Sequence, residues 1–169
     1  MRFSQEFAKK PTDWQVDAMQ DDVEFTDLPA SYHSHPVTTA RGHNSSPVSL
    51  YSDGIPLHNR ETFIVWYFTS LLSRKRYLVC SLKKGDDCKC GCRGMCTFIA
   101  IHTLLVWMFN VLASGVWCTT DHLGNPLTGW RHGKVGELAN GWAGALCEYR
   151  ADLLEMVTAY GFKTWANIL

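Results

Sequence analysis

The chain has 169 residues, which is enough for one domain with a hydrophobic core and too few for two ordinary domains. Its 16 basic and 16 acidic residues cancel, which excludes a strongly basic or strongly acidic protein. The charges are uneven, because residues 1–46 hold four basic and seven acidic residues, whereas residues 47–169 hold twelve and nine.

Residues 1–46 are predicted to be a mostly disordered or extended lead-in, because they show no apolar periodicity and include a stretch rich in Ser, Thr, His and Pro. The pair His33 and His35 invites a metal-binding interpretation, but we interpret it as part of a solvated loop. The start of the chain also lacks an apolar stretch of signal-peptide length. This favours an intracellular, reducing compartment, with the nucleus as one option.

Three β-prone runs follow from Pro47 onward, at Val48–Asp53, Thr62–Leu71 and Tyr77–Leu82. The first run is predicted to end in a turn at Asp53-Gly54. The short connection between the second and third runs predicts an antiparallel hairpin.

The segment Thr97–Cys118 contains no charged residue and has two interpretations. It is long and apolar enough for a membrane span, and basic residues precede it. Alternatively, it is a core helix, since Thr103, Asn110 and Ser114 would form a narrow polar stripe on one side. In that case His102 and Trp107 are core residues whose polar atoms are satisfied.

After this segment, residues 119–140 are predicted to form a loop because they hold several glycines and no periodic pattern. A strand at Gly144–Ala151 and an amphipathic helix at Leu153–Tyr160, closed by Gly161, complete the chain. The predicted fold is therefore α/β: a mixed sheet that begins with a three-strand meander, then a long helix, a fourth strand and a helix.

The most informative motif is a run of four cysteines, Cys88, Cys90, Cys92 and Cys96, within residues 86–96. Four thiolates complete the tetrahedral coordination of Zn²⁺ and leave no open position, which is typical of a structural site. The spacing differs from that of ordinary zinc ribbons, so one of the four is open to replacement by Cys80, Cys118 or His122. Ordinary reduced thiols and disulfides are the remaining interpretations.

Two aspartates form a second, weaker signal, because Asp53 and Asp152 each follow a predicted strand. Carboxylates at neighbouring strand ends can share divalent metal ions for phosphoryl transfer. The plainer interpretation is that Asp53 belongs to a turn and Asp152 caps a helix.

Three features recur in the same order in a known group: an Asp-Gly pair after an apolar strand, the block C-x-C-G-C-x-G-x-C at residues 88–96, and an aspartate followed by the Gly-Phe-x-x-Trp segment at 161–165. Over residues 35–169 the chain resembles multi-copy, mobile-element-like proteins of dinoflagellate genomes, with a ribonuclease-H-like core of the transposase and integrase kind. The resemblance implies that Asp53 and Asp152 are the first two acidic residues of an Mg²⁺ site. A third acid on a later helix is missing, so the chain looks truncated, and we do not expect it to be an active enzyme alone.

The sequence thus predicts a degenerate transposase-like domain with structural Zn²⁺ that binds DNA or RNA, with residues 47–169 as a partial ribonuclease-H-like domain. The alternatives are a non-enzymatic zinc-binding interaction module, and a small single-pass membrane protein with its helix at 97–118. Nucleic acid would be bound by a set of basic residues: Arg74, Lys75, Arg76, Lys83, Lys84, Lys89 and Arg93.

Overall fold

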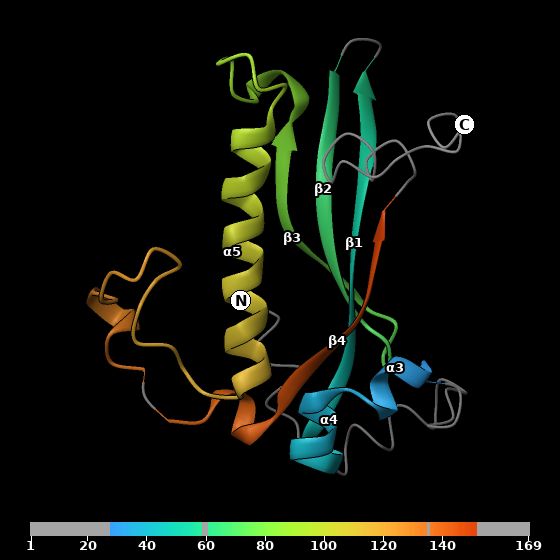
Figure 1. Ribbon diagram of the computed structural model, residues 1–169, viewed down its shortest axis with the longest axis vertical. Coiled ribbons are helices and arrows are strands. Elements are labelled where there is room, and N and C mark those ends of the chain that lie inside the picture. The colour runs from blue at the N-terminus through green and yellow to red at the C-terminus, as the bar shows by residue number, and fades with distance from the viewer. Residues whose placement is uncertain (1–27, 59–60, 135, 152–169) are drawn as a thin grey trace.

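A computed structural model of the chain describes residues 28–58, 61–134 and 136–151 (Figure 1). Its main elements are, in chain order, α3 (Ala30–His33), α4 (Pro36–Arg41), β1 (Ser45–His58), β2 (Glu61–Ser70), β3 (Arg76–Lys83), α5 (Met95–Ser114) and β4 (Ala143–Ala151). Short 3-10 helices connect them: η2 (Gly42–Asn44), η3 (Lys84–Asp86), η4 (Gly129–Arg131) and η5 (Leu138–Gly141). The helix predicted at Leu153–Tyr160 lies outside the described residues.

The four strands form one mixed sheet in the order β3-β2-β1-β4. β1, β2 and β3 pair antiparallel, which confirms the predicted meander and its hairpin. β4 lies parallel to β1, so the chain must cross from one end of the sheet to the other between β3 and β4. The long helix α5 makes this crossover on one face of the sheet, as Figure 1 shows. The predicted α/β class is therefore confirmed.

The prediction that the first strand ends at Asp53 is wrong. β1 continues to His58, and both residues of the expected turn pair with β2, Asp53 with Val65 and Gly54 with Ile64. A tight hairpin turn at Asp-Gly needs positive φ, and Gly54 is not among the glycines that have it. β2 supplies partners for three further positions beyond Gly54, so the strand continues through the glycine.

One line of α5 residues forms the core with the sheet. Phe98, Leu105 and Leu112 are seven residues apart, which places them on one side of the helix, and all three are buried. Near one end of α5, Leu112 belongs to a cluster with Val48, Phe68 and Trp142. Near the other end, Phe98 and Leu105 belong to a cluster with Leu50 and Trp66.

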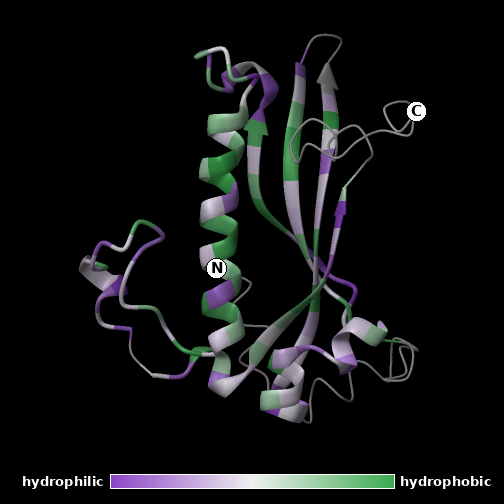
Figure 2. Cartoon of the chain, in the orientation of Figure 1, coloured by the Kyte–Doolittle hydropathy of each residue, from purple (hydrophilic) through white to green (hydrophobic). Residues whose placement is uncertain are grey.

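The rest of α5 is less covered than a core helix would be. Ile99 and Val106 are 58% and 60% exposed, and in Figure 2 hydrophobic colouring recurs along the visible length of α5, interrupted by hydrophilic bands. By length and composition α5 could also cross a membrane, with a mean hydropathy of 1.9 in its most apolar window, of which 17% is buried. The core-helix interpretation therefore accounts for one side of α5 only. His102 and Trp107 do have the expected polar partners, since His102 Nδ1 lies 2.7 Å from Phe98 O and Trp107 Nε1 donates to Thr120 O.

Residues 28–44 differ from the expected lead-in, because α3 and α4 are regular and pack against the sheet. Tyr32 is 2% exposed and its hydroxyl donates to Ser45 O at 3.0 Å, in a cluster with Leu28, Leu72 and Ala145. The buried aromatic ring and its hydrogen-bonded hydroxyl help to hold this segment on the sheet. His35 is the N-cap of α4, since its Nδ1 accepts from Val37 N.

Candidate metal centre

The four cysteines lie where β3 is joined to α5, at the top of Figure 1. The Sγ atoms of Cys88, Cys90, Cys92 and Cys96 all lie within 4.8 Å of one another. The local backbone turns sharply here because three of four consecutive residues have positive φ: Gly91 at 91°, Arg93 at 56° and Gly94 at 83°. Such φ values do not occur in an extended or right-handed helical chain. Cys92 is the residue between them.

The distances between sulfurs approach those of a tetrahedral zinc site. Cys88 Sγ lies 3.0 Å from Cys90 Sγ and 3.3 Å from Cys92 Sγ, and Cys90 Sγ lies 3.8 Å from Cys96 Sγ. Zn–S bonds of about 2.3 Å in tetrahedral geometry require sulfurs about 3.8 Å apart. Cys88 Sγ would have to move outward by less than about 1 Å from Cys90 Sγ and Cys92 Sγ to reach this separation.

The structure also shows which cysteines lie close enough to bind one metal ion. All four predicted ligands converge, so none has to be replaced. Cys80 packs in the core cluster under α5, Cys118 lies just beyond the opposite end of α5, and His122 packs edge-on against Trp107. The irregular spacing therefore still yields four neighbouring sulfurs, because the first turn of α5 carries the last of them.

Hydrogen bonds hold the cluster to the first turn of α5. The backbone N–H of Cys96 donates to Cys92 Sγ at 3.3 Å, and the backbone N–H of Cys88 donates to Thr97 Oγ1 at 2.9 Å. The N-terminal end of a helix carries partial positive charge, which stabilises nearby thiolates. Gly94 precedes the helix in left-handed conformation, and a Cβ there would lie 2.9 Å from Asp87 Oδ2.

The thiols affect one another's protonation. The hydrogen bonds from Cys96 N–H and from the Cys88 thiol lower the pKa of Cys92 to about 6. Hydrogen bonding to Cys92 raises the pKa of Cys96 to about 12, and hydrogen bonding to Cys90 raises the pKa of Cys88. Cys92 is therefore the cysteine that is most readily deprotonated, because its neighbours donate hydrogen bonds to its sulfur. A cation changes this, since metal ligands must all be deprotonated.

The seven predicted basic residues fall into two groups at opposite ends of β3. Arg74, Lys75 and Arg76 are exposed at the β2–β3 turn, and the other four lie from the end of β3 to the cysteine loop. An eight-residue strand separates the groups by about 25 Å. Two of the second group are engaged by carboxylates, since Lys83 Nζ lies 2.5 Å from Glu61 Oε1 and Lys89 Nζ lies 2.8 Å from Asp87 Oδ1. The second bond lowers the pKa of Asp87.

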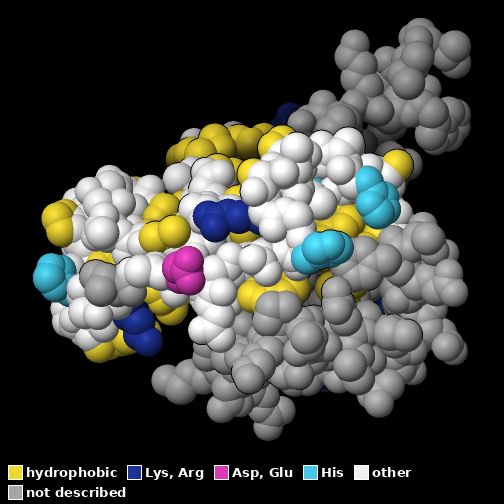
Figure 3. All heavy atoms as spheres, turned by 90° about the horizontal axis from the view of Figure 1, so that it is seen from below, with side chains coloured by type: hydrophobic (Ala, Val, Ile, Leu, Met, Phe, Trp, Pro, Cys, Tyr) yellow, Lys and Arg dark blue, Asp and Glu magenta, His cyan; other side chains and the backbone are white. Residues whose placement is uncertain are grey.

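Seen from below, the described part of the molecule shows Lys and Arg side chains that lie apart, between hydrophobic and His side chains (Figure 3). The predicted basic residues form two separate surfaces rather than one because β3 lies between the two groups.

Asp53 lies in the middle of β1 and turns away from α5. The neighbouring Ser52 is fully buried and bonded to Tyr149 on the α5 side, so alternation along the strand places Asp53 on the other face. The Tyr51 hydroxyl donates to Asp53 Oδ2 at 3.1 Å. The parallel ladder of β1 and β4 ends at Ser52 and Ala151, one residue before each predicted aspartate, and Asp152 lies outside the described residues.

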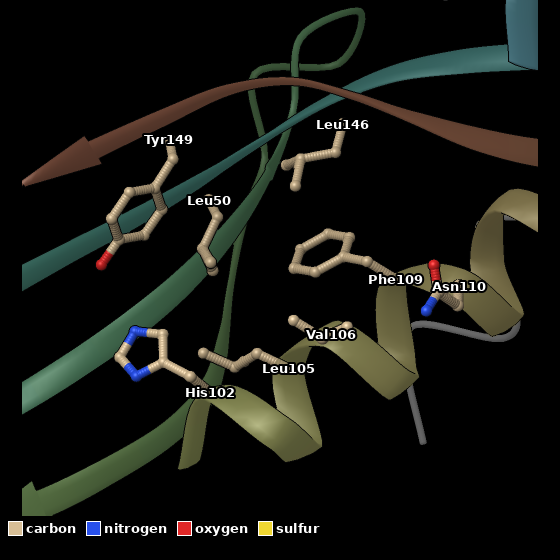
Figure 4. A pocket seen from close by; sticks show the side chains of 8 residues that line it. All are labelled: Leu50, His102, Leu105, Val106, Phe109, Asn110, Leu146 and Tyr149. Carbon is tan, nitrogen blue, oxygen red and sulfur yellow. The ribbon is translucent and has the colours of Figure 1, made fainter. Parts of the chain in front are cut away.

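The sequence did not predict an apolar cavity of about 300 Å³ between α5 and the strands β1 and β4 (Figure 4). Half of the residues in its walls are aliphatic, and His102 and Tyr149 lie at the same end. The Tyr149 hydroxyl is 2.6 Å from Ser52 Oγ. No sequence motif marks these residues, because they come together only when β4 joins β1.

Comparison with family models, curated proteins and solved structures finds no match to this chain.

Proposed function

We propose that this chain is a zinc-binding domain in which Cys88, Cys90, Cys92 and Cys96 hold one structural Zn²⁺. The single observation that carries the proposal is the convergence of four Sγ atoms within 4.8 Å. Four thiolates saturate tetrahedral zinc, so the site has no position for a substrate or a reactive water. The ion would act by joining the end of β3 to the start of α5.

The location of the centre explains why a metal would matter for the fold. The connection from β3 to α5 is mostly polar, and Gly94 is the one buried residue between Asp87 and Thr97. Residues 87–97 therefore contribute little hydrophobic stabilisation to the start of the helix that covers the sheet. A bound ion would supply the missing cross-link, and its binding free energy would add to folding stability.

As a finer proposal, the domain is a ribonuclease-H-like relative of transposases and integrases. The supporting observation is the topology, a three-strand meander followed by a long helix and a strand parallel to β1. In this proposal Asp53 and Asp152 are remnants of an Mg²⁺ site. The activity proposed for such a domain is the binding of nucleic acid.

The β2–β3 turn is the better candidate for contact with DNA or RNA. Arg74, Lys75 and Arg76 are all exposed there. Around the cysteines, four basic residues face three acidic ones, Glu61, Asp86 and Asp87, and a tetrathiolate zinc centre adds a net charge of about −2. That end is therefore slightly negative once zinc is bound.

Metal analysis of the purified chain tests the main proposal. We expect one zinc ion per chain, and loss of most of it in the Cys92→Ser variant. The matched control is Cys118→Ser, which removes a half-buried thiol outside the cluster and should keep the full zinc content. Zinc-free protein, with all four cluster thiols freely alkylated, would rule the proposal out.

Titration with DNA and RNA tests the finer proposal. Replacing Arg74, Lys75 and Arg76 by Ala should weaken binding and reduce its salt dependence, because phosphate contacts release counterions. Replacing Arg131 and Lys134 by Ala is the control of similar type. Equal affinity in both variants would remove the β2–β3 turn as the binding surface. Mn²⁺ binding that is unchanged in Asp53→Asn would remove the carboxylate site.

A membrane location is the second candidate, favoured by the exposed apolar side of α5. Carbonate extraction of cell membranes distinguishes a membrane-spanning α5 from a core helix, since a membrane span stays with the lipid. Recovery of the chain in the soluble fraction without detergent would exclude the membrane location.

A further inference from the structure

We propose that Cys90 and Cys96 are an oxidation site, at which a hydroperoxide forms a reversible disulfide and thereby releases the metal. The inference rests on the proposed zinc site for its consequence, but the disulfide itself needs only the observed placement of the two thiols.

Cys90 and Cys96 are the two cluster cysteines that are exposed, whereas Cys88 and Cys92 are half-buried. Their Sγ atoms lie 3.8 Å apart. A disulfide bond is about 2.05 Å long, so closure needs a movement of just under 2 Å in an exposed segment. Both sulfurs are therefore open to a small oxidant and close enough to react with each other.

The other pairs of sulfurs are closer but less suited to form a bond. Cys88 and Cys90 are 3.0 Å apart but have only one residue between them, which conflicts with the narrow range of backbone separations in disulfides. Cys88 and Cys92 are 3.3 Å apart, and the Cys96 backbone N–H donates to Cys92 Sγ, which holds that sulfur in place. Five residues separate Cys90 from Cys96, so this loop can close without such a constraint.

The chemistry balances with hydrogen peroxide as the oxidant. The Cys90 thiolate attacks one peroxide oxygen, the O–O bond breaks, and a sulfenic acid and hydroxide form. The hydroxide takes the proton of the Cys96 thiol, and the resulting thiolate attacks the Cys90 sulfur, so that the S–O bond breaks and a second hydroxide leaves. With one proton taken up by that hydroxide, one thiolate, one thiol and one peroxide yield one disulfide and two waters.

Loss of the metal follows from the ligand count. After the disulfide forms, only Cys88 and Cys92 remain as thiolates, and two ligands do not complete the coordination that structural zinc requires. The bond from Cys88 N to Thr97 Oγ1 does not involve a sulfur, so the start of α5 stays connected to the loop. Oxidation should thus release zinc without unfolding the sheet.

The test treats the zinc-loaded full-length chain with increasing hydrogen peroxide and follows free zinc with a chromogenic chelator, then maps disulfides by mass spectrometry. We expect one zinc released per disulfide, a single Cys90–Cys96 bond, five of the seven thiols still reactive, and full recovery of zinc binding after a thiol reductant. Cys118→Ser should behave like the parent chain, and Cys90→Ser should leave Cys96 out of any disulfide.

A disulfide at other positions, irreversible over-oxidation, or zinc that stays bound while Cys118 is oxidised would overturn the inference. The same oxidation of the metal-free chain keeps the two proposals distinguishable. If the protein never binds zinc but still forms the Cys90–Cys96 bond, the zinc proposal fails and the oxidation site stands.

Discussion

Gly144 of β4 lies so close to Leu112 of α5 that a Cβ atom at position 144 would be 2.5 Å from Leu112 Cδ2. No real Cβ contact is this short, so the absence of a side chain sets how near α5 can lie to the strand. The same approach buries Leu112 against Val48 and Trp142. The position of α5 on the sheet therefore depends on a single hydrogen atom in place of a methyl group.

Replacing Gly144 by Ala should destabilise the fold by about 1–3 kcal/mol, because the added methyl group overpacks a buried site. The matched control is Gly133→Ala, where the nearest atom to a Cβ is 3.9 Å away and φ is not positive. Urea unfolding monitored by tryptophan fluorescence gives both values. Equal stability of the two variants would mean that α5 is not held at this distance.

The two sides of α5 should respond differently to truncation. Leu105 is 2% exposed, so Leu105→Ala should lower the free energy of unfolding by about 2–5 kcal/mol. Its neighbour Val106 is 60% exposed, and Val106→Ala should change the same quantity by less than about 0.5 kcal/mol. If Val106→Ala cost as much as Leu105→Ala, the outer side of α5 would be covered in solution.

Gly94 should be needed for metal affinity. Gly94→Ala places a Cβ 2.9 Å from Asp87 Oδ2 at a residue whose φ is 83°, so the cysteine loop would have to shift. We expect weaker zinc binding, measured by competition with a chromogenic chelator. Gly85→Ala is the control, because a Cβ there meets nothing within 4 Å and φ is not positive. Equal affinities would show that the loop geometry does not position the ligands.

The alkaline stability of the fold should depend on Tyr32. Burial raises the pKa of Tyr32 above its ordinary value of 10.0. Above pH 10 the unfolded chain therefore loses the tyrosine proton before the folded chain does, and the free energy of unfolding falls as pH rises from there towards the folded-state pKa. Below pH 10 this contribution is fully present.

The Tyr32→Phe variant checks this by its slope rather than by its absolute stability, since it also loses the hydrogen bond to Ser45 O. We expect unfolding free energies measured between pH 9 and about 11.5 to fall less steeply in the variant than in the parent chain. Equal slopes of unfolding free energy against pH in the two proteins would mean that the pKa of Tyr32 is not raised in the folded state.

Several features follow from the sequence alone. The runs at 62–71 and 77–82 become β2 and β3 because their β-branched and aromatic residues favour strands and the link between them is short. The absence of charge over 97–118 predicts a long helix, and the spacing of four cysteines predicts ligands that lie close together. These are local properties, set by side chains a few residues apart.

Only the tertiary structure decided the rest. Asp53-Gly54 is a common turn sequence, but β2 offers pairing partners along its whole length, so the chain stays extended there. The basic residues appear as one group in the sequence, yet β3 places them at opposite ends. Whether a turn forms, which end of a strand a charge occupies, and which side of a helix is covered depend on contacts between distant segments. Propensity and spacing do not contain that information, because the partner that determines the outcome lies elsewhere in the chain.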